Sequence, residues 1–300
     1  MIALVVVGAV ASPGVLGRQL AGTATAVPVP DPPRVGDCLT TAPDLTSASL
    51  LVPIAPCVAG RFGEVVAVAD DPRVGAATSR RQHDDDAEVS DERERQHCAD
   101  QVLRYLGLTI GPDHEGFVES YWQPLVPLDM SIDRPSARQV AAGQHWVACS
   151  FYVHDHTGRA ASYRNSARDA YGAGVPPAAL AYCLTVGDLT TGESVPCSEP
   201  HRAEAFGGTR TARPGLTKAS MDASCRALAS RLTRMPDPSG GGVLRVEAVA
   251  VHGPTGTNEP GLGGPNDPTG FAACVVSAAD TRLLVGSLLA LGGRPVPWQR

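Results

Sequence analysis

The sequence predicts an α+β fold of two similar disulfide-stapled domains, each a small, mainly antiparallel sheet with one packed helix. The eight cysteines divide into two sets of four with matching surroundings, a Pro-Cys-x6-Glu unit occurs once in each set, and one amphipathic segment follows each unit. Aligned features that recur in one order indicate an internal repeat. The cysteines are Cys38, Cys57, Cys98 and Cys149, then Cys183, Cys197, Cys225 and Cys274.

The chain begins with an uncharged stretch, residues 2–17, that ends before Arg18. It is shorter than the roughly 20 residues that a helix needs to span a bilayer, but it fits the apolar core of a signal peptide. The positively charged start of such a peptide is missing, so we expect the native chain to begin upstream of Met1. We assign residues 1–20 to a membrane anchor or an uncleaved or truncated signal segment, and residues 21–33 to a Pro-rich linker.

One helix is predicted in each half from apolar residues at helical spacing. The first follows Ser90, which can act as the N-cap, and ends at Gly107. The second lies within residues 219–234 and ends before Pro236. Each helix places a cysteine on its buried stripe, which consists of Cys98, Val102, Leu103 and Leu106 in the first helix and of Met221, Cys225, Leu228 and Leu232 in the second.

Strands are predicted at the apolar runs on either side of each helix. With a strand at the first cysteine of each set and another at the Pro-Cys unit, each half reads β-β-β-α-β-β. The longer runs lie at residues 64–70, 124–132, 145–153, 243–251 and 271–278.

These elements divide the rest of the chain into two domains. We expect a first repeat at 34–153, a linker at 154–177, a second repeat at 178–292 and a tail at 293–300. The apolar segment at 281–293 is too short for a membrane span and is expected to pack on a domain.

The cysteine spacing favours disulfides over metal ligands. Gaps between consecutive cysteines of one set range from 14 to 51 residues, and the short Cys-x2–4-Cys pairs typical of structural zinc sites are missing. Each disulfide would stabilise its domain by about 3–4 kcal/mol and would place the protein in an oxidising compartment. Four cysteines allow three pairings. We expect the first to bond the second and the third to bond the fourth: Cys38–Cys57, Cys98–Cys149, Cys183–Cys197 and Cys225–Cys274.

The order Gly-Asp-Cys-Leu, Pro-Cys-Ser-Glu-Pro-His-x-x-Glu, a helical cysteine and Trp-x-x-Cys resembles the septum formation family. The resemblance covers residues 34–153 and 178–278. The first repeat departs from the pattern at Gly60-Arg61, where Pro-His is expected, and the second lacks a tryptophan before Cys274. The resemblance implies a mostly actinobacterial, membrane-anchored envelope protein, often with two copies of the domain, and it brings no catalytic residues.

His201 and Glu204 of the second unit are the first candidates for a site. A histidine near a carboxylate can act as a ligand pair or an acid–base pair. A structural turn is favoured, in which Pro200 directs the chain and Glu204 accepts hydrogen bonds from backbone N–H groups or an arginine. The first unit keeps the glutamate, as Glu64, but has no histidine. The shared glutamate therefore points to architecture.

The remaining candidates are weaker. His154 and His156 could bind a transition metal, the run Asp84–Asp86 could attract calcium, and Trp122 and Trp146 could form a stacking platform. A solvated histidine pair, a solvated charge run and core packing are the favoured interpretations. A Gly-x-Ser-x-Gly elbow and a phosphate-binding Gly-rich loop are missing from the sequence. We expect no metal and no cofactor.

The net charge of −6 argues against nucleic-acid binding. The resemblance, together with the cysteines and the N-terminal segment, implies a non-enzymatic, membrane-tethered extracytoplasmic binding or scaffold protein of the cell envelope. Its expected partners are envelope or division proteins, and it would contact the membrane through the N-terminal segment. Two alternatives stay open: an extracytoplasmic hydrolase that uses His201 and Glu204, and a secreted ligand-binding protein.

Overall fold

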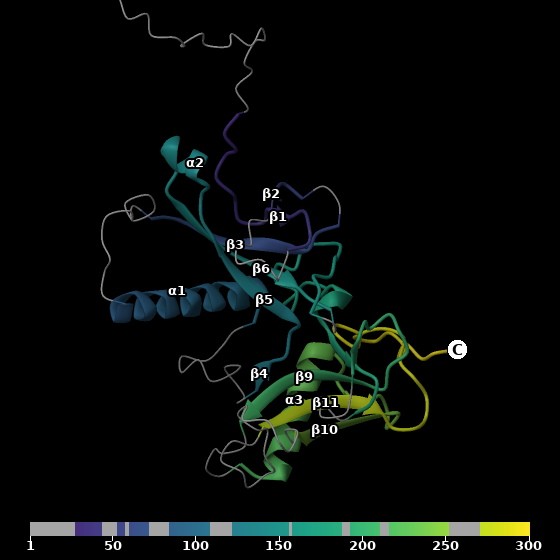
Figure 1. Cartoon of the computed structure of the whole chain (residues 1–300). Coiled ribbons are helices and arrows are strands. Elements are labelled where there is room, and N and C mark those ends of the chain that lie inside the picture. Colours follow the sequence, from purple (N-terminus) through teal and green to yellow (C-terminus); the bar gives the residue numbers. More distant parts are fainter. Residues whose placement is uncertain are drawn as a thin grey trace, which may run out of the picture.

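The computed structural model describes residues 28–43, 53–57, 60–71, 84–108, 122–155, 158–187, 193–210, 216–251 and 271–300. Within these residues the chain forms two antiparallel sheets, each with one long helix packed on one face (Figure 1). The α+β class predicted from the sequence is confirmed. The strands of the first half, in chain order, are β1 Cys38–Leu39, β2 Ile54–Ala55, β3 Gly63–Asp70, β4 Gln123–Pro124, β5 Leu128–Asp133 and β6 Trp146–Val153.

The first sheet has the order β2-β1-β3-β6-β5. Its longest pair, β3 and β6, lies at the centre and is antiparallel, with a register shift between Val65 and Ala67 that marks a β-bulge. The alternation of side chains along β6 places Cys149, Phe151 and Val153 on the face that the helix covers.

The second sheet has the order β10-β11-β9-β7-β8, and β4 of the first half also pairs with β9. Counted along the chain and without β4, both sheets follow the order second, first, third, fifth, fourth strand. The strands of the second half are β7 Tyr182–Leu184, β8 Ser194–Val195, β9 Ala203–Arg210, β10 Leu244–Val251 and β11 Phe271–Ala278.

The first long helix, α1, spans Asp84–Tyr105 and is longer than predicted. The prediction of Ser90 as its N-cap is wrong, because the helix begins six residues earlier. The run Asp84–Asp86 forms the start of the helix. The helix ends where expected, at Gly107, whose φ of 78° suits a glycine after a helix.

The second long helix, α3, spans Lys218–Thr233. Thr217 and Ser220 form a capping box at its start. Arg234 ends it in the left-handed conformation, shortly before Pro236, as the sequence predicts. Its buried face includes Met221, Cys225, Leu228 and Leu232, the stripe predicted from the spacing.

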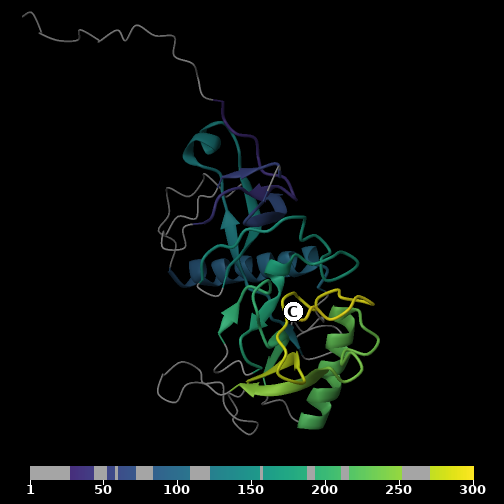
Figure 2. The same cartoon turned by 90° about the vertical axis from the view of Figure 1, so that its right-hand side faces the viewer.

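The two halves pack against each other and share one hydrophobic core (Figure 2). Strand β4 belongs to the first half along the chain but pairs with Gly207 and Gly208 of β9. Next to it, the fully buried Trp122 donates a hydrogen bond from its indole Nε1 to Ser224 Oγ of α3 at 2.7 Å. Trp122 therefore serves core packing between the halves rather than an exposed stacking platform.

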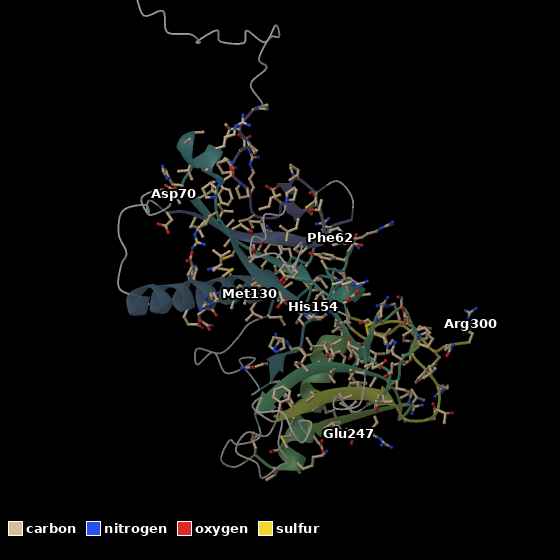
Figure 3. All side chains as sticks on the ribbon, viewed as in Figure 1. Phe62, Asp70, Met130, His154, Glu247 and Arg300 are labelled. Atoms are coloured by element: carbon tan, nitrogen blue, oxygen red, sulfur yellow. A yellow bond between two sulfur atoms is a disulfide. The ribbon has the colours of Figure 1, made fainter. Side chains whose placement is uncertain are left out.

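Three of the four expected cysteine pairings are disulfides in the structure: Cys38–Cys57, Cys183–Cys197 and Cys225–Cys274. The first two link neighbouring segments of a sheet, and the third links α3 to β11. Cys98 of α1 and Cys149 of β6 are buried thiols without an S–S bond. Figure 3 shows the side chains of the described residues on the ribbon of both halves. The fourth pairing stays a prediction.

The Pro-rich segment is held against the first half at Pro30. The carbonyl oxygen of Pro30 accepts a hydrogen bond from Gln144 Nε2 at 2.7 Å and one from Gln139 Nε2 at 3.5 Å. Gln139 belongs to the short helix α2, Ala137–Ala141. The predicted anchor at 1–20 lies outside the described residues, and the helices that are described contain none long and apolar enough to cross a bilayer.

Replacing Trp122 by alanine should lower the free energy of unfolding by about 3–5 kcal/mol, because the indole is fully buried at the junction of the halves. Urea denaturation followed by circular dichroism measures this change. Ser224→Ala is the matched control: it removes only the partner of the indole N–H and should cost about 1–3 kcal/mol. Equal midpoints for wild type and Trp122→Ala would contradict the packing role.

Candidate functional site

The two Pro-Cys-x6-Glu units occupy the same place in the two sheets. Glu64 lies on β3 directly opposite Cys38 of β1, and Glu204 lies on β9 directly opposite Cys183 of β7. In each unit the cysteine after the proline forms the disulfide to the strand that faces the glutamate. The unit therefore links two neighbouring strands by a disulfide and directs one glutamate side chain into the protein interior.

Glu64 is a fully buried carboxylate with five donors. Its Oε2 accepts hydrogen bonds from the hydroxyl groups of Tyr105 at 2.5 Å and Ser166 at 2.8 Å. Its Oε1 accepts from the Tyr163 hydroxyl at 3.1 Å and the Ala167 N–H at 2.8 Å, and it pairs with the Arg61 guanidinium at 3.3 Å. The negative charge is thus balanced by a cation and distributed over several donors.

The hydroxyl groups of Tyr105 and Tyr163 keep their protons beside the Glu64 carboxylate. Burial, reinforced by the adjacent Glu64 carboxylate, raises the pKa of Tyr105 and of Tyr163. A raised tyrosine pKa keeps the hydroxyl hydrogen in place as a donor to the carboxylate. Glu64 is therefore a charged structural centre that draws a strand, a helix and a later loop together.

Glu204 is equally buried but has a poorer set of partners. Its Oε1 accepts a hydrogen bond from the Ser287 hydroxyl at 2.9 Å, and its Oε2 accepts one from the Leu288 N–H at 2.6 Å. Among the residues that the structure describes, no cation forms an ion pair with it. Burial raises the pKa of Glu204 to about 7, although the hydrogen bonds from Leu288 and Ser287 act in the opposite direction.

The segments that cover the two glutamates have the same hydrogen-bond pattern. We call residues 158–174 the first strap and residues 283–299 the second strap. Each strap contains a two-residue bridge to the Pro-Cys unit, Arg61–Tyr163 in the first strap and His201–Leu284 in the second. Each then supplies a serine and a backbone N–H to the carboxylate three and four residues later.

Each strap also ties to the end of its helix. The N–H of Asp169 donates to the Tyr105 carbonyl at 2.7 Å, and the N–H of Ala290 donates to the Leu232 carbonyl at 2.8 Å. Both strap residues, Asp169 and Ala290, have positive φ, 54° and 51°.

The first strap lies inside the segment 154–177, which the sequence suggests is a linker. The apolar segment 281–293 packs on the second half as expected, with Leu284 and Leu288 fully buried. The domain boundaries themselves stay predictions.

His201 has a structural place in the fold: its backbone bridges Leu284, and its ring is packed in the interior. Its side chain is fully buried, and Nδ1 donates to the Glu199 carbonyl at 2.8 Å, which leaves Nε2 as an acceptor. Nε2 has no hydrogen-bond partner among the residues that the structure describes. Burial lowers the pKa of His201, so the ring is neutral at physiological pH. The structure records no hydrogen bond between His201 and Glu204.

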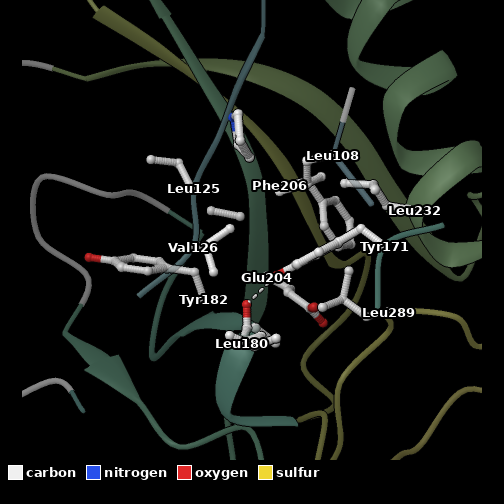
Figure 4. A pocket seen from close by; sticks show the side chains of 13 residues that line it. Leu108, Leu125, Val126, Tyr171, Leu180, Tyr182, Glu204, Phe206, Leu232 and Leu289 are labelled. Carbon is white, nitrogen blue, oxygen red and sulfur yellow. Dashed lines mark hydrogen bonds between the residues drawn. The ribbon is translucent and has the colours of Figure 1, made fainter. Parts of the chain in front are cut away.

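A cavity of about 10 Å³ lies beside Glu204 at the junction of the two halves. Figure 4 shows Glu204 there among apolar side chains, including Leu180 and Leu289, and near Tyr171, whose hydroxyl donates to the Leu180 carbonyl at 2.7 Å. A space of this size holds about one water molecule. It has no room for an organic substrate.

The weaker candidates do not gather into a site. His154 bridges Ala160, while His156 lies outside the described residues. Trp146 is mostly buried and donates to Gln144 at 2.9 Å. The run Asp84–Asp86 forms the first turn of α1. The part of the chain that is described contains no group of three or more His, Cys, Asp or Glu side chains able to hold a metal ion.

Sequence reasoning missed the donors to the two glutamates, namely Tyr105, Tyr163, Ser166 and Ser287. A signal for two of them was present: Tyr163-x-x-Ser166 and Leu284-x-x-Ser287 place a serine three residues after the bridge to the Pro-Cys unit. Aligning the segments after the fourth cysteines would have revealed it.

Comparison with known proteins gives one match. Residues 35–237 match the family model described as septum formation. No curated protein and no solved structure matches the chain.

We expect Glu204→Gln to weaken the pH dependence of stability. The pKa of Glu204 is about 7 in the folded protein and about 4.3 in an unfolded chain. The stabilising contribution of Glu204 should therefore be fully present below about pH 4.3, and this group should remove about 2–3 kcal/mol of unfolding free energy between pH 5 and pH 8. Urea denaturation at both values measures the loss. The exposed Glu199→Gln is the control and should behave like the wild type; a Glu204→Gln variant that does so too would disprove the assignment.

Glu64→Gln should instead lower the free energy of unfolding, because it leaves the largely buried Arg61 without its charged partner. A cost of about 3 kcal/mol is expected. The double variant Arg61→Leu/Glu64→Gln removes the unpaired charge and should recover part of this loss. Thermal unfolding of the three proteins distinguishes the outcomes, and a double variant less stable than Glu64→Gln would count against the ion-pair explanation.

Proposed function

Because the chain belongs to the septum formation family, we propose that it is a membrane-tethered, extracytoplasmic protein of the actinobacterial cell envelope that binds or scaffolds other proteins during septum formation. In this proposal the protein catalyses no reaction. Its work is done by the outer surface of two rigid domains, and its partners are envelope or division proteins.

We also infer that the two halves are copies of one domain. They share the strand order, a β-bulge in the third strand, a disulfide next to the buried glutamate, and a strap with the same hydrogen bonds. Agreement at this many positions supports duplication more strongly than strand order alone, because small antiparallel sheets often share simple topologies.

The observation that carries the proposal is the burial of Glu64 and Glu204 beneath their straps. Both side chains are fully buried and occupied by donors from the chain itself. The motif Pro-Cys-Ser-Glu-Pro-His-x-x-Glu thus contributes to the framework, since a substrate has no access to these carboxylates. This supports a binding or scaffold role over hydrolysis by His201 and Glu204.

The three disulfides support a location outside the cytoplasm, where such bonds form and persist. The uncharged N-terminal stretch followed by a Pro-rich segment supports a tether with an extended linker. Secretion after cleavage remains the competing arrangement, and N-terminal sequencing of the membrane and medium fractions separates the two.

Fluorescent fusion of the full chain in its native host tests the cellular role. We expect the fusion to concentrate at division sites and depletion of the protein to delay septa. Normal septa after depletion, together with an even distribution around the cell, would refute the proposal.

Complementation of the depleted strain tests the absence of catalysis. His201→Ala, produced at wild-type level and with an unchanged Tm, should restore septa as well as the wild type does. His154→Ala, which alters a histidine outside the unit, is the matched control. Failure of His201→Ala alone, with intact folding, would favour the hydrolase.

A further inference from the structure

Cys98 and Cys149 lie at positions of the first half that are equivalent to those of the Cys225–Cys274 disulfide in the second half. In both halves one cysteine lies on the long helix and the other on the last strand of the sheet. The sulfur of the helix cysteine also lies at the same part of the neighbouring edge strand. Cys98 Sγ is 3.7 Å from the Ser131 carbonyl oxygen, and Cys225 Sγ is 3.3 Å from the Glu247 carbonyl oxygen.

The strand cysteines agree in register as well. Cys149 pairs with Ile132, the residue after Ser131 on β5. Cys274 pairs with Ala248, the residue after Glu247 on β10. Each pair therefore sits between the helix and the two outer strands at one equivalent point, and in the second half that geometry accommodates an S–S bond.

The two thiols of the first half contact each other and are not equivalent. Cys98 is 0% exposed and Cys149 is 7% exposed. The interaction between the two neighbouring thiols, with burial, raises the pKa of Cys98, and the interaction with Cys98 lowers the pKa of Cys149. Cys149 is thus both the more accessible sulfur and the one that forms a thiolate more readily, and the thiolate is the reactive species in exchange.

We propose that Cys98 and Cys149 form an oxidation site that acquires a fourth disulfide by exchange with a disulfide oxidant, with Cys149 as the attacking thiol and Cys98 as the resolving thiol.

In the first step Cys149 loses its proton and its thiolate attacks one sulfur of the oxidant. The S–S bond of the oxidant breaks, one half leaves with the electron pair and takes up a proton, and a mixed disulfide to Cys149 forms. In the second step Cys98 loses its proton and attacks the Cys149 sulfur, and the second half of the oxidant leaves as a thiol. The protein gives up two protons and two electrons, and the oxidant becomes two thiols.

The bond would connect the helix to the sheet at a point that matters for the buried carboxylate. Helix α1 carries Cys98 and, near its end, Tyr105, whose hydroxyl donates to Glu64. Oxidation at Cys98 therefore fixes the element that supplies one of the donors to Glu64, as Cys225–Cys274 fixes α3 in the second half.

Two single variants of the full chain test the order of attack. Each is incubated with glutathione disulfide, and the modified cysteine is identified by peptide mass mapping. Cys98→Ser should accumulate glutathione on Cys149. Cys149→Ser should react at Cys98 at least about tenfold more slowly than Cys98→Ser reacts at Cys149, because the Cys98 thiol is fully buried and less acidic. Equal rates, or faster reaction at Cys98, would overturn the assignment of Cys149 as the attacking thiol.

The wild type, prepared with these two thiols reduced, tests the bond itself. Oxidant should yield a Cys98–Cys149 linked peptide without a lasting mixed disulfide and should raise the Tm by on the order of 10 °C. The double variant Cys98→Ser/Cys149→Ser should show no such rise under the same treatment. If both thiols of the folded wild type remain open to alkylation after oxidation, while the other six cysteines stay bonded, the proposal is refuted.

Discussion

Each half of the protein buries one glutamate beneath a strap of irregular chain, and the arrangement of each half depends on that contact. A strap without regular hydrogen bonds must find partners for its N–H groups. The carboxylate provides two strong acceptors at one point, and the helix end provides the next carbonyls. The strand, the helix and the strap thus meet at the side chain that the Pro-Cys unit positions.

The two buried glutamates have different side chains around them, although the backbone arrangement is the same in both halves. Around Glu64 the chain places Arg61, Tyr105 and Tyr163, which supply the carboxylate with a cation and two hydroxyl donors. At the corresponding points around Glu204 it places His201, Leu232 and Leu284, as the bridges and the strap-to-helix hydrogen bonds show. Removal of the cation and two hydroxyl donors explains why burial dominates the titration of Glu204.

Much of the fold could be predicted from the sequence because its signals are local. Apolar spacing located α3 and the long strands, and the cysteine order identified three bonded pairs. The start of α1 could not be predicted, since its first turns are polar and carry no apolar period. Strand β4 was missed as a partner of β9 because two residues give no periodicity and the pairing crosses from one half to the other. The site was foreseen as a turn around a shared glutamate, but four of the five donors to Glu64 lie 41 to 103 residues away along the chain, and only the folded structure brings them near.

The contact between Pro30 and the glutamines near α2 determines where the N-terminal segment leaves the folded part. That exit lies at the end of the first half farthest from α3 and the C-terminus (Figures 1 and 2). If that segment is the membrane tether proposed above, the first half lies nearer to the bilayer than the second half does. A partner bound to the second half would then be kept away from the lipid surface by the thickness of the first half.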